Sequence, residues 1–99
     1  MIRVRKLDVR GKSLLGLEVD IPNSPPAVMI IGEKGFAMCG FLNIEAADRV
    51  GVAAVMASGV RSVEDLLNSR VAGATSKALE MGVNIGERVE ESLFKMETE

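Results

Sequence analysis

The stretch that decides the fold is Gly35-Phe36-Ala37-Met38-Cys39-Gly40-Phe41-Leu42-Asn43. It contains the only cysteine of the chain and two of its three phenylalanines, and a strand-like pattern changes here into a helix-like one. A small side chain between glycines at the end of a strand lets the backbone come close to a ligand or another chain. We therefore predict close-approach backbone at Gly35 and Gly40, and Cys39 is the candidate for any catalytic role.

Upstream of this stretch, the N-terminal residues predict a hairpin. Residues 2–9 form a strand pattern whose apolar residues change face halfway, so we expect a bulge or a twist near Arg5-Lys6. Gly11-Lys12 supplies a two-residue turn. The returning strand alternates cleanly, and we expect its apolar side chains to face the core: Leu15, Leu17, Val19 and Ile21.

Two further runs are apolar without interruption, at residues 27–31 and 52–57. Such runs are typical of strands that are covered on both faces or buried at an interface. Between the first run and the central stretch lies Gly32-Glu33-Lys34-Gly35, a loop with glycine at each end. Residues 36–40 are therefore predicted to pair back as the second arm of a hairpin.

The remaining segments predict short helices. Asn43 and Ser62 are good N-caps for two of them, and further helix patterns cover residues 71–82 and 89–96. We expect residues 97–99 to be frayed. Together these patterns predict one α+β domain over residues 1–99, with two layers: a mostly antiparallel five-stranded sheet and three to four short helices packed on one of its faces.

Composition excludes several classes of function. The net charge is −2, and the basic residues gather only near the N-terminus, where no tyrosine or tryptophan offers a stacking platform, so we expect no nucleic-acid partner. The longest nearly apolar segment, residues 51–60, is about half a membrane span, and no signal-peptide pattern precedes it. One cysteine gives no internal disulfide. We expect a cytoplasmic protein that does not bind membranes.

Little of the familiar catalytic and metal chemistry fits this sequence. The chain has no histidine, which removes Cys-His and Ser-His-Asp arrangements and histidine-based zinc sites, and one thiolate cannot build a metal cage. We expect no metal and no cofactor. Unpaired cysteine is among the most buried residue types, so a structural role for Cys39 is favoured over a nucleophilic or redox role.

The second candidate site is a turn that leads from an apolar strand into a capped helix. Free backbone N–H groups and the helix dipole point out of such a junction, and a guanidinium would add a fork for a carboxylate or phosphate. Against this reading, two acidic residues already occupy the first helical turn. The candidate anion ligands are Ser58, Gly59, Arg61 and Ser62.

Three methionines, Met29, Met38 and Met56, lie on three different strand patterns and could face one another. A cluster of thioethers would suit Cu(I). The favoured interpretation is that they fill gaps in a core that has few aromatic rings.

Several short motifs carry a family resemblance: Gly35-Phe36, Met38-Cys39-Gly40, Leu42, Ala53-Ala54, Gly59-Val60, Leu66-Leu67, Ala78, Gly82, Gly86 and Leu93. From Ala27 onward the chain resembles the YunC-like family of small bacterial and archaeal proteins, a domain of unknown function. Phe36 stands where the resemblance leads us to expect tyrosine, and the second glycine expected after Gly86 is missing. The resemblance implies a compact α+β domain and supplies no catalytic residue.

These observations favour a non-enzymatic module that forms oligomers or binds another protein. The two continuous apolar runs offer more buried surface than short helices cover, so we expect a homodimer or another homo-oligomer. The alternative is a small anionic-ligand or enzymatic site between Cys39 and the turn at residues 58–62.

Overall fold

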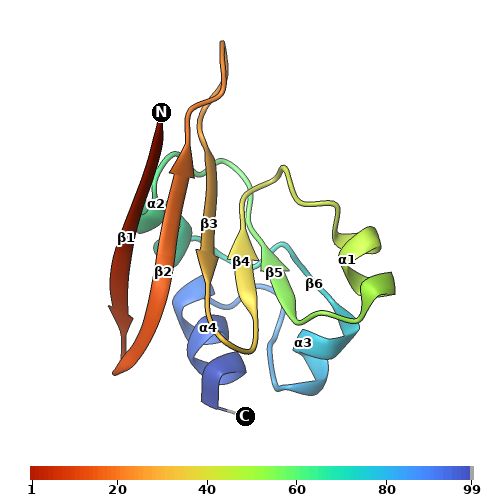
Figure 1. Cartoon of the computed structure of the whole chain (residues 1–99). Coiled ribbons are helices and arrows are strands. Elements are labelled where there is room, and N and C mark those ends of the chain that lie inside the picture. Colours follow the sequence, from red (N-terminus) through yellow and green to blue (C-terminus); the bar gives the residue numbers. More distant parts are fainter. Residues whose placement is uncertain (99) are drawn as a thin grey trace.

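The computed structural model of the protein describes residues 1–98 and contains a six-stranded sheet in the order β1-β2-β3-β4-β5-β6 (Figure 1). Neighbouring strands are antiparallel except β4 and β5, which are parallel. The strands are β1 (Ile2–Val9), β2 (Lys12–Val19), β3 (Ala27–Ile31), β4 (Phe36–Met38), β5 (Ala54–Met56) and β6 (Gly73–Ala74).

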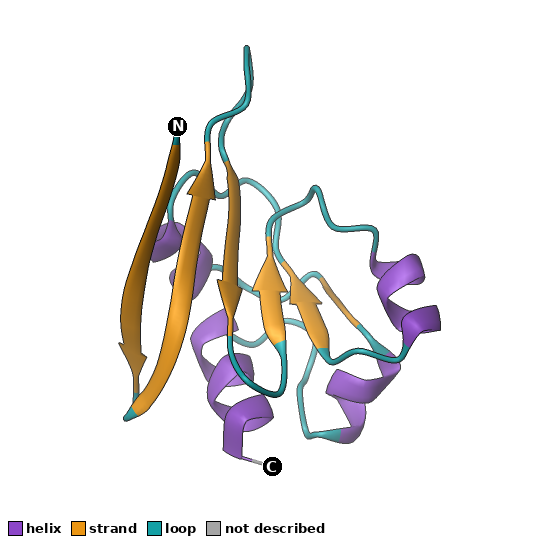
Figure 2. Cartoon of the chain, in the orientation of Figure 1, coloured by secondary structure: helices purple, strands orange, loops and turns teal. Residues whose placement is uncertain are grey.

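Four helices accompany the sheet within the described residues: α1 (Ile44–Val50), α2 (Val63–Asn68), α3 (Ser76–Glu80) and α4 (Val89–Thr98). Helices α2 and α4 pack behind strands β1 to β4, whereas α1 and α3 contact β5 (Figure 2). None of these helices is long and apolar enough to cross a membrane. The predicted α+β class with a mostly antiparallel sheet is confirmed.

The sixth strand is the element that the sequence did not predict. Residues 71–74 were expected to be helical, but Gly73 and Ala74 pair with β5 as β6, and only Ser76–Glu80 form a helix. A two-residue strand is too short to show an alternating pattern, and its position depends on a partner strand far away in the chain. Pairing with β5 therefore overrode the local helix signal.

Turn and cap residues set the ends of the elements. Asn43 accepts a hydrogen bond from the amide of Ala46 at 3.0 Å, and Gly51 ends α1 in the left-handed conformation with φ 93°. The first hairpin turns at Arg10-Gly11, one residue earlier than predicted, with φ values of 52° and 87°. Two consecutive positive φ values are what a tight two-residue hairpin turn requires.

The core lies between the sheet and the helices α2 and α4. Val28 and Ile30 of β3 are fully buried against it. Leu66 from α2 and Leu93 and Met96 from α4 are also fully buried. Within the described residues the buried hydrophobic side chains include no aromatic ring, as expected from a chain with three phenylalanines.

The first hairpin differs from expectation in two ways. Its register is continuous from Ile2 opposite Val19 to Val9 opposite Lys12, so of the two alternatives near Arg5-Lys6 the bulge is wrong. The apolar residues of β1 change face because Val9 belongs to the core cluster and Leu7 packs against it, whereas Ile2 and Val4 stand on the opposite face and are exposed.

The predicted inward face of β2 is also wrong. Leu14 and Gly16 are buried toward the helices, whereas Leu15 is 41% exposed. A Cβ at Gly16 would lie 3.1 Å from a methyl carbon of Val63, the first residue of α2. The glycine therefore lets α2 pack closely on β2, and this close approach decides which face of the hairpin is covered.

The opposite face of strands β1 to β4 is apolar, and we call it the open face. Register and strand alternation place its residues side by side. They are exposed or half-buried, unlike the fully buried residues of the helix side. The open face consists of Ile2, Val4, Leu15, Leu17, Val19, Ala27, Met29, Ile31, Phe36 and Met38.

Candidate functional site

The structure brings part of the predicted site together at a cavity of about 200 Å³. Cys39 is 4% exposed there, and its Sγ accepts a hydrogen bond from the amide of Val28 at 3.4 Å. The lining is mainly apolar or backbone, which suits a small apolar group better than an anion. The cavity is lined by Ser24, Pro25, Pro26, Cys39, Gly40, Phe41, Gly59 and Val60.

The other predicted anion ligands have partners within the chain. The amide of Arg61 donates to Oδ2 of Asp65 at 3.1 Å, and Oγ of Ser62 accepts from the amide of Asp65 at 3.1 Å. The hydroxyl of Ser58 lies 3.9 Å from the sulfur of Met56. Of the predicted set, Gly59 lines the cavity with Cys39, and an anion-binding role for Arg61 stays a prediction.

The two predicted close-approach glycines lie in different surroundings. A Cβ at Gly35 would lie 2.7 Å from Sδ of Met96 and 3.0 Å from the carbonyl oxygen of Ala53, so the chain itself packs on this glycine. At Gly40 the nearest atom would be Oγ of Ser58 at 3.7 Å, which is an ordinary contact. Gly40 is exposed and borders the cavity.

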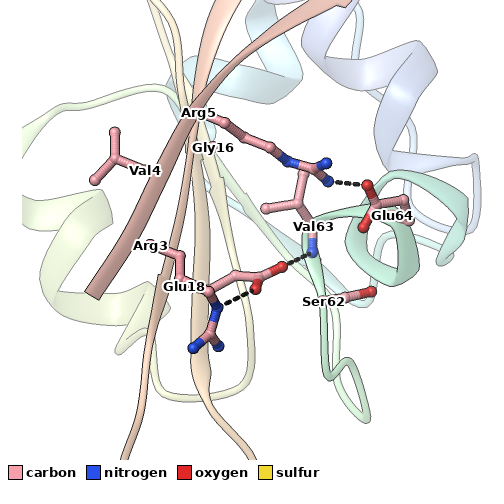
Figure 3. A pocket seen from close by; sticks show the side chains of 8 residues that line it. All are labelled: Arg3, Val4, Arg5, Gly16, Glu18, Ser62, Val63 and Glu64. Carbon is pink, nitrogen blue, oxygen red and sulfur yellow. Dashed lines mark hydrogen bonds and ion pairs between the residues drawn. The ribbon is translucent and has the colours of Figure 1, made fainter. Parts of the chain in front are cut away.

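A second cavity, of about 290 Å³, lies between the first hairpin and the start of α2 (Figure 3). The carboxylate of Glu18 links the hairpin side of this cavity to the helix side by hydrogen bonds. Oε2 of Glu18 accepts from the amide of Val63 at 2.8 Å, and Oε1 accepts from Nε of Arg3 at 3.0 Å. The Val63 amide, followed by the Arg3 guanidinium, lowers the pKa of Glu18 below its ordinary value.

Two of the basic residues near the N-terminus, Arg3 and Arg5, pair with carboxylates around this cavity. Arg3 also bonds Oδ1 of Asp20 at 3.0 Å, and Arg5 forms an ion pair with Glu64 (Figure 3). Arg5 therefore links the hairpin to the start of α2, whereas Arg3 links β1 to carboxylates in β2 and directly after it. The sequence contained a signal for the Arg3 pair, because Arg3 and Glu18 stand opposite each other in the hairpin register.

A carboxylate from the last helix occupies the loop between β3 and β4. Oε1 of Glu97 accepts from the amide of Glu33 at 2.9 Å, and Oε2 accepts from the amides of Lys34 and Gly35, each at 3.0 Å. The prediction of frayed ends is therefore wrong for Glu97 and for Thr98, which both belong to α4, while Glu99 lies outside the described residues. In the sequence, only the glycines at the two ends of this loop pointed to a close contact there.

The three methionines form a row across the sheet. Met29 stands opposite Met38, and Met38 stands opposite Met56 in the strand register. All three are half-buried. Met38 packs against the buried core cluster, as the core-filling interpretation expects, while Met29 and Met38 also belong to the open face. Within residues 1–98, no group of three or more Cys, Asp or Glu side chains is placed to hold a metal ion.

Comparisons with known proteins agree with the resemblance found in the sequence. The chain is 26% identical over 100 residues to the uncharacterized protein YunC of Bacillus subtilis (strain 168), covering 97% of this chain and 98% of that protein. It is similar in structure to TA1206, a protein of unknown function from Thermoplasma acidophilum, with a TM-score of 0.91 and 33% identity over 97% of this chain and 93% of that one.

The matched part of the chain contains most of the elements described above. A family pattern described as a domain of unknown function (DUF1805) covers residues 38–96, which run from the end of β4 through Cys39 to the core residue Met96 of α4. With more than half of its length in that match, this chain belongs to the DUF1805 family.

Proposed function

We propose that the protein is a non-enzymatic module that forms a homodimer through its open face. The observation that carries the proposal is the exposure of large apolar side chains on a contiguous sheet surface: Ile2 is 64% exposed, Val4 56%, Leu15 41% and Ile31 36%. Contiguous apolar patches of this kind on a protein surface mark sites of interaction. We also propose a cytoplasmic location, because the single cysteine of the chain is free and forms no internal disulfide.

The charge pattern favours a second copy of the same chain as the partner. The β2, β3 and β4 rows of the open face carry no charged side chain, and Lys6 on β1 stands at its border. Two identical faces can therefore meet about a twofold axis without opposing like charges, although each chain has a net charge of −2. A partner with a strongly charged surface would lack complementary groups here.

The size of this face also suits a dimer. The molecule measures 36 × 30 × 22 Å. Its shortest dimension corresponds to the thickness of one sheet and one layer of helices. The sheet therefore forms one of the two broad sides. A side of this extent accommodates the about 800 Å² that each partner contributes to a standard stable interface.

The methionines support the same proposal. Met29 and Met38 occupy the middle of the open face, and flexible thioether side chains adapt well to a facing apolar surface. Phe36 adds an aromatic ring to the same row, and aromatic residues and methionine are both enriched at interfaces. The open face thus has the composition of an interface core.

The experiment is a mass measurement on matched variants. Leu15→Lys places a charge on the open face, whereas Leu79→Lys places one on α3 at a position that is 47% exposed, close to the 41% of Leu15. By light scattering at about 100 μM, wild type and Leu79→Lys should have twice the 10.6 kDa chain mass, and Leu15→Lys should be monomeric. Circular dichroism checks that both variants are folded.

A monomeric wild-type protein at this concentration would overturn the proposal. A Leu15→Lys variant that stays dimeric would move the interface away from the open face. Val4→Glu, also on the open face and 56% exposed, repeats the test with the opposite charge, so a folding defect at one position cannot decide the outcome.

The alternative site between Cys39 and the turn at residues 58–62 is distinguished by thiol chemistry. An activated thiol beside Arg61 would be alkylated faster than a free thiol and would be protected by a bound anion. We expect the opposite, because Cys39 is 4% exposed and its sulfur is held by the Val28 amide. Alkylation with iodoacetamide should be slow until denaturant unfolds the protein, and rapid alkylation of folded protein would favour the alternative.

A further inference from the structure

The loop Gly32-Glu33-Lys34-Gly35 points three consecutive backbone amides at one place. The amides of Glu33, Lys34 and Gly35 all donate to the carboxylate of Glu97, at 2.9, 3.0 and 3.0 Å. The loop is closed by a hydrogen bond from the amide of Gly32 to the carbonyl of Gly35 at 2.9 Å, which fixes the direction of the amides between them. Successive amides that converge in this way form an anion-binding concavity.

Gly32 makes room for the anion. A Cβ built on Gly32 would lie 2.4 Å from Cδ and 2.4 Å from Oε2 of Glu97, so any other residue would fill the space that the carboxylate occupies. The φ of Gly32 lies outside the left-handed region, because the residue is absent from the positive-φ glycines of the chain. The glycine is therefore needed for space and not for backbone conformation.

Glu97 is held there against the preference of its own helix. It lies in the last turn of α4, where the exposed carbonyl groups disfavour a negative charge. The loop amides offset this cost by supplying three donors to the carboxylate. The loop thus recognises an oxyanion in its own right, and the helix contributes only the group that fills it.

We propose that the loop Gly32–Gly35 is an oxyanion-binding site whose resident ligand is the carboxylate of Glu97, and that a small carboxylate or phosphate competes for it. The site opens when the last turn of α4 unwinds, since helix ends open at low free-energy cost. A tethered carboxylate acts at an effective concentration in the millimolar range, so an external anion binds weakly while Glu97 is present. The proposal is independent of the dimer interface.

The experiment follows the amide resonances of Glu33, Lys34 and Gly35 by NMR during titration with inorganic phosphate, with sodium chloride holding the ionic strength constant. In Glu97→Ala these resonances should saturate at a phosphate concentration at least about tenfold lower than in wild type, because the tethered competitor is gone. Glu91→Ala removes a carboxylate from the same helix that pairs with Arg10, and it should behave as wild type. Acetate in place of phosphate shows which oxyanion is preferred.

The matched control adds Gly32→Ala to Glu97→Ala. In that background the new methyl group meets no carboxylate, so the fold tolerates it, but it fills the position of the anion. Phosphate should then shift the three amides no more than in wild type. Glu97→Gln, which keeps a hydrogen-bond acceptor, guards against a folding defect in Glu97→Ala and should show an intermediate response.

Two results would overturn the proposal. One is a folded Glu97→Ala and Glu97→Gln pair whose loop amides respond to phosphate no better than wild type, which would make Glu97 a purely structural latch. The other is an unchanged phosphate response when Gly32→Ala is added, which would place any bound phosphate outside this loop.

Discussion

At the scale of single residues, the contacts that matter most here join a glycine to a group from far along the chain. Gly16 admits Val63, and Gly32 admits the carboxylate of Glu97. In both cases the missing Cβ provides space where two elements meet. A side chain added at either glycine should therefore destabilise the protein mainly by displacing the group that now fills this space.

The first prediction tests this at Gly32. Gly32→Ala should lower the free energy of unfolding by about 1–3 kcal/mol, because it expels a carboxylate from three amide donors. In a Glu97→Ala background the same change should cost close to nothing. Urea unfolding of the wild type, both single variants and the double variant measures this coupling. As a control, the same set of variants is measured with Glu91→Ala in place of Glu97→Ala. If Gly32→Ala lowered the free energy of unfolding equally in the wild-type, Glu97→Ala and Glu91→Ala backgrounds, the prediction would be contradicted.

At the scale of elements, α2 depends on tertiary contacts. It has six residues, far fewer than the about 12–15 that an isolated helix needs in water. Glu18 from β2 holds its first amide, Ser62 caps it, and Leu66 anchors it in the core. The helix therefore owes its position to a carboxylate on a neighbouring strand as much as to its own cap.

The second prediction concerns pH. The amide of Val63 and then Arg3 lower the pKa of Glu18 in the folded state, so its stabilisation is present above the ordinary pKa of 4.5 and is lost as the pH falls through the lower folded-state value. Glu18→Gln should cost about 1–2 kcal/mol of unfolding free energy at pH 7, and this difference should vanish in acid. Urea unfolding from pH 7 to pH 2.5 measures it.

Ser62→Ala is the control for this series. Ser62 caps the same helix and does not titrate, so its cost should stay about constant across the range. If Glu18→Gln cost the same at every pH, the Glu18–Val63 contact would not depend on the ionised carboxylate.

At the scale of the whole molecule, the helices α2 and α4 cover one face of strands β1 to β4, and the open face on the other side carries exposed and half-buried apolar side chains. Of the hydrophobic residues, which make up 47% of the chain, many lie in the buried core and a further group lies on the open face. Since like charges are absent from the centre of the open face, the hydrophobic effect should drive association there.

The third prediction follows from that driving force. The dimer dissociation constant should be nearly unchanged between 50 and 500 mM sodium chloride, because few charges lie in the interface to be screened. Sodium sulfate, which strengthens apolar burial, should tighten the dimer. Sedimentation equilibrium measures both, and dissociation by sodium chloride would indicate an interface made of ion pairs.

Much of the local structure could be predicted from the sequence. The limits of β1 and β3, the cap residues Asn43 and Ser62, and the hairpin that joins β3 to β4 all agree with the patterns read from neighbouring residues. These features depend on side chains that act within a few positions of themselves. The family resemblance, carried by residues such as Met38-Cys39-Gly40, was visible for the same reason.

The sequence by itself thus determined the α+β class, most of the elements and the two-faced pattern of β2, because period and capping are local properties. Only the tertiary structure decided which face of β2 is covered, since an alternating strand carries two faces and the approach of α2 at Gly16 selects one. Likewise, Glu18 meets Val63 across 45 positions and Glu97 meets Gly35 across 62, and no local pattern encodes contacts of such sequence separation.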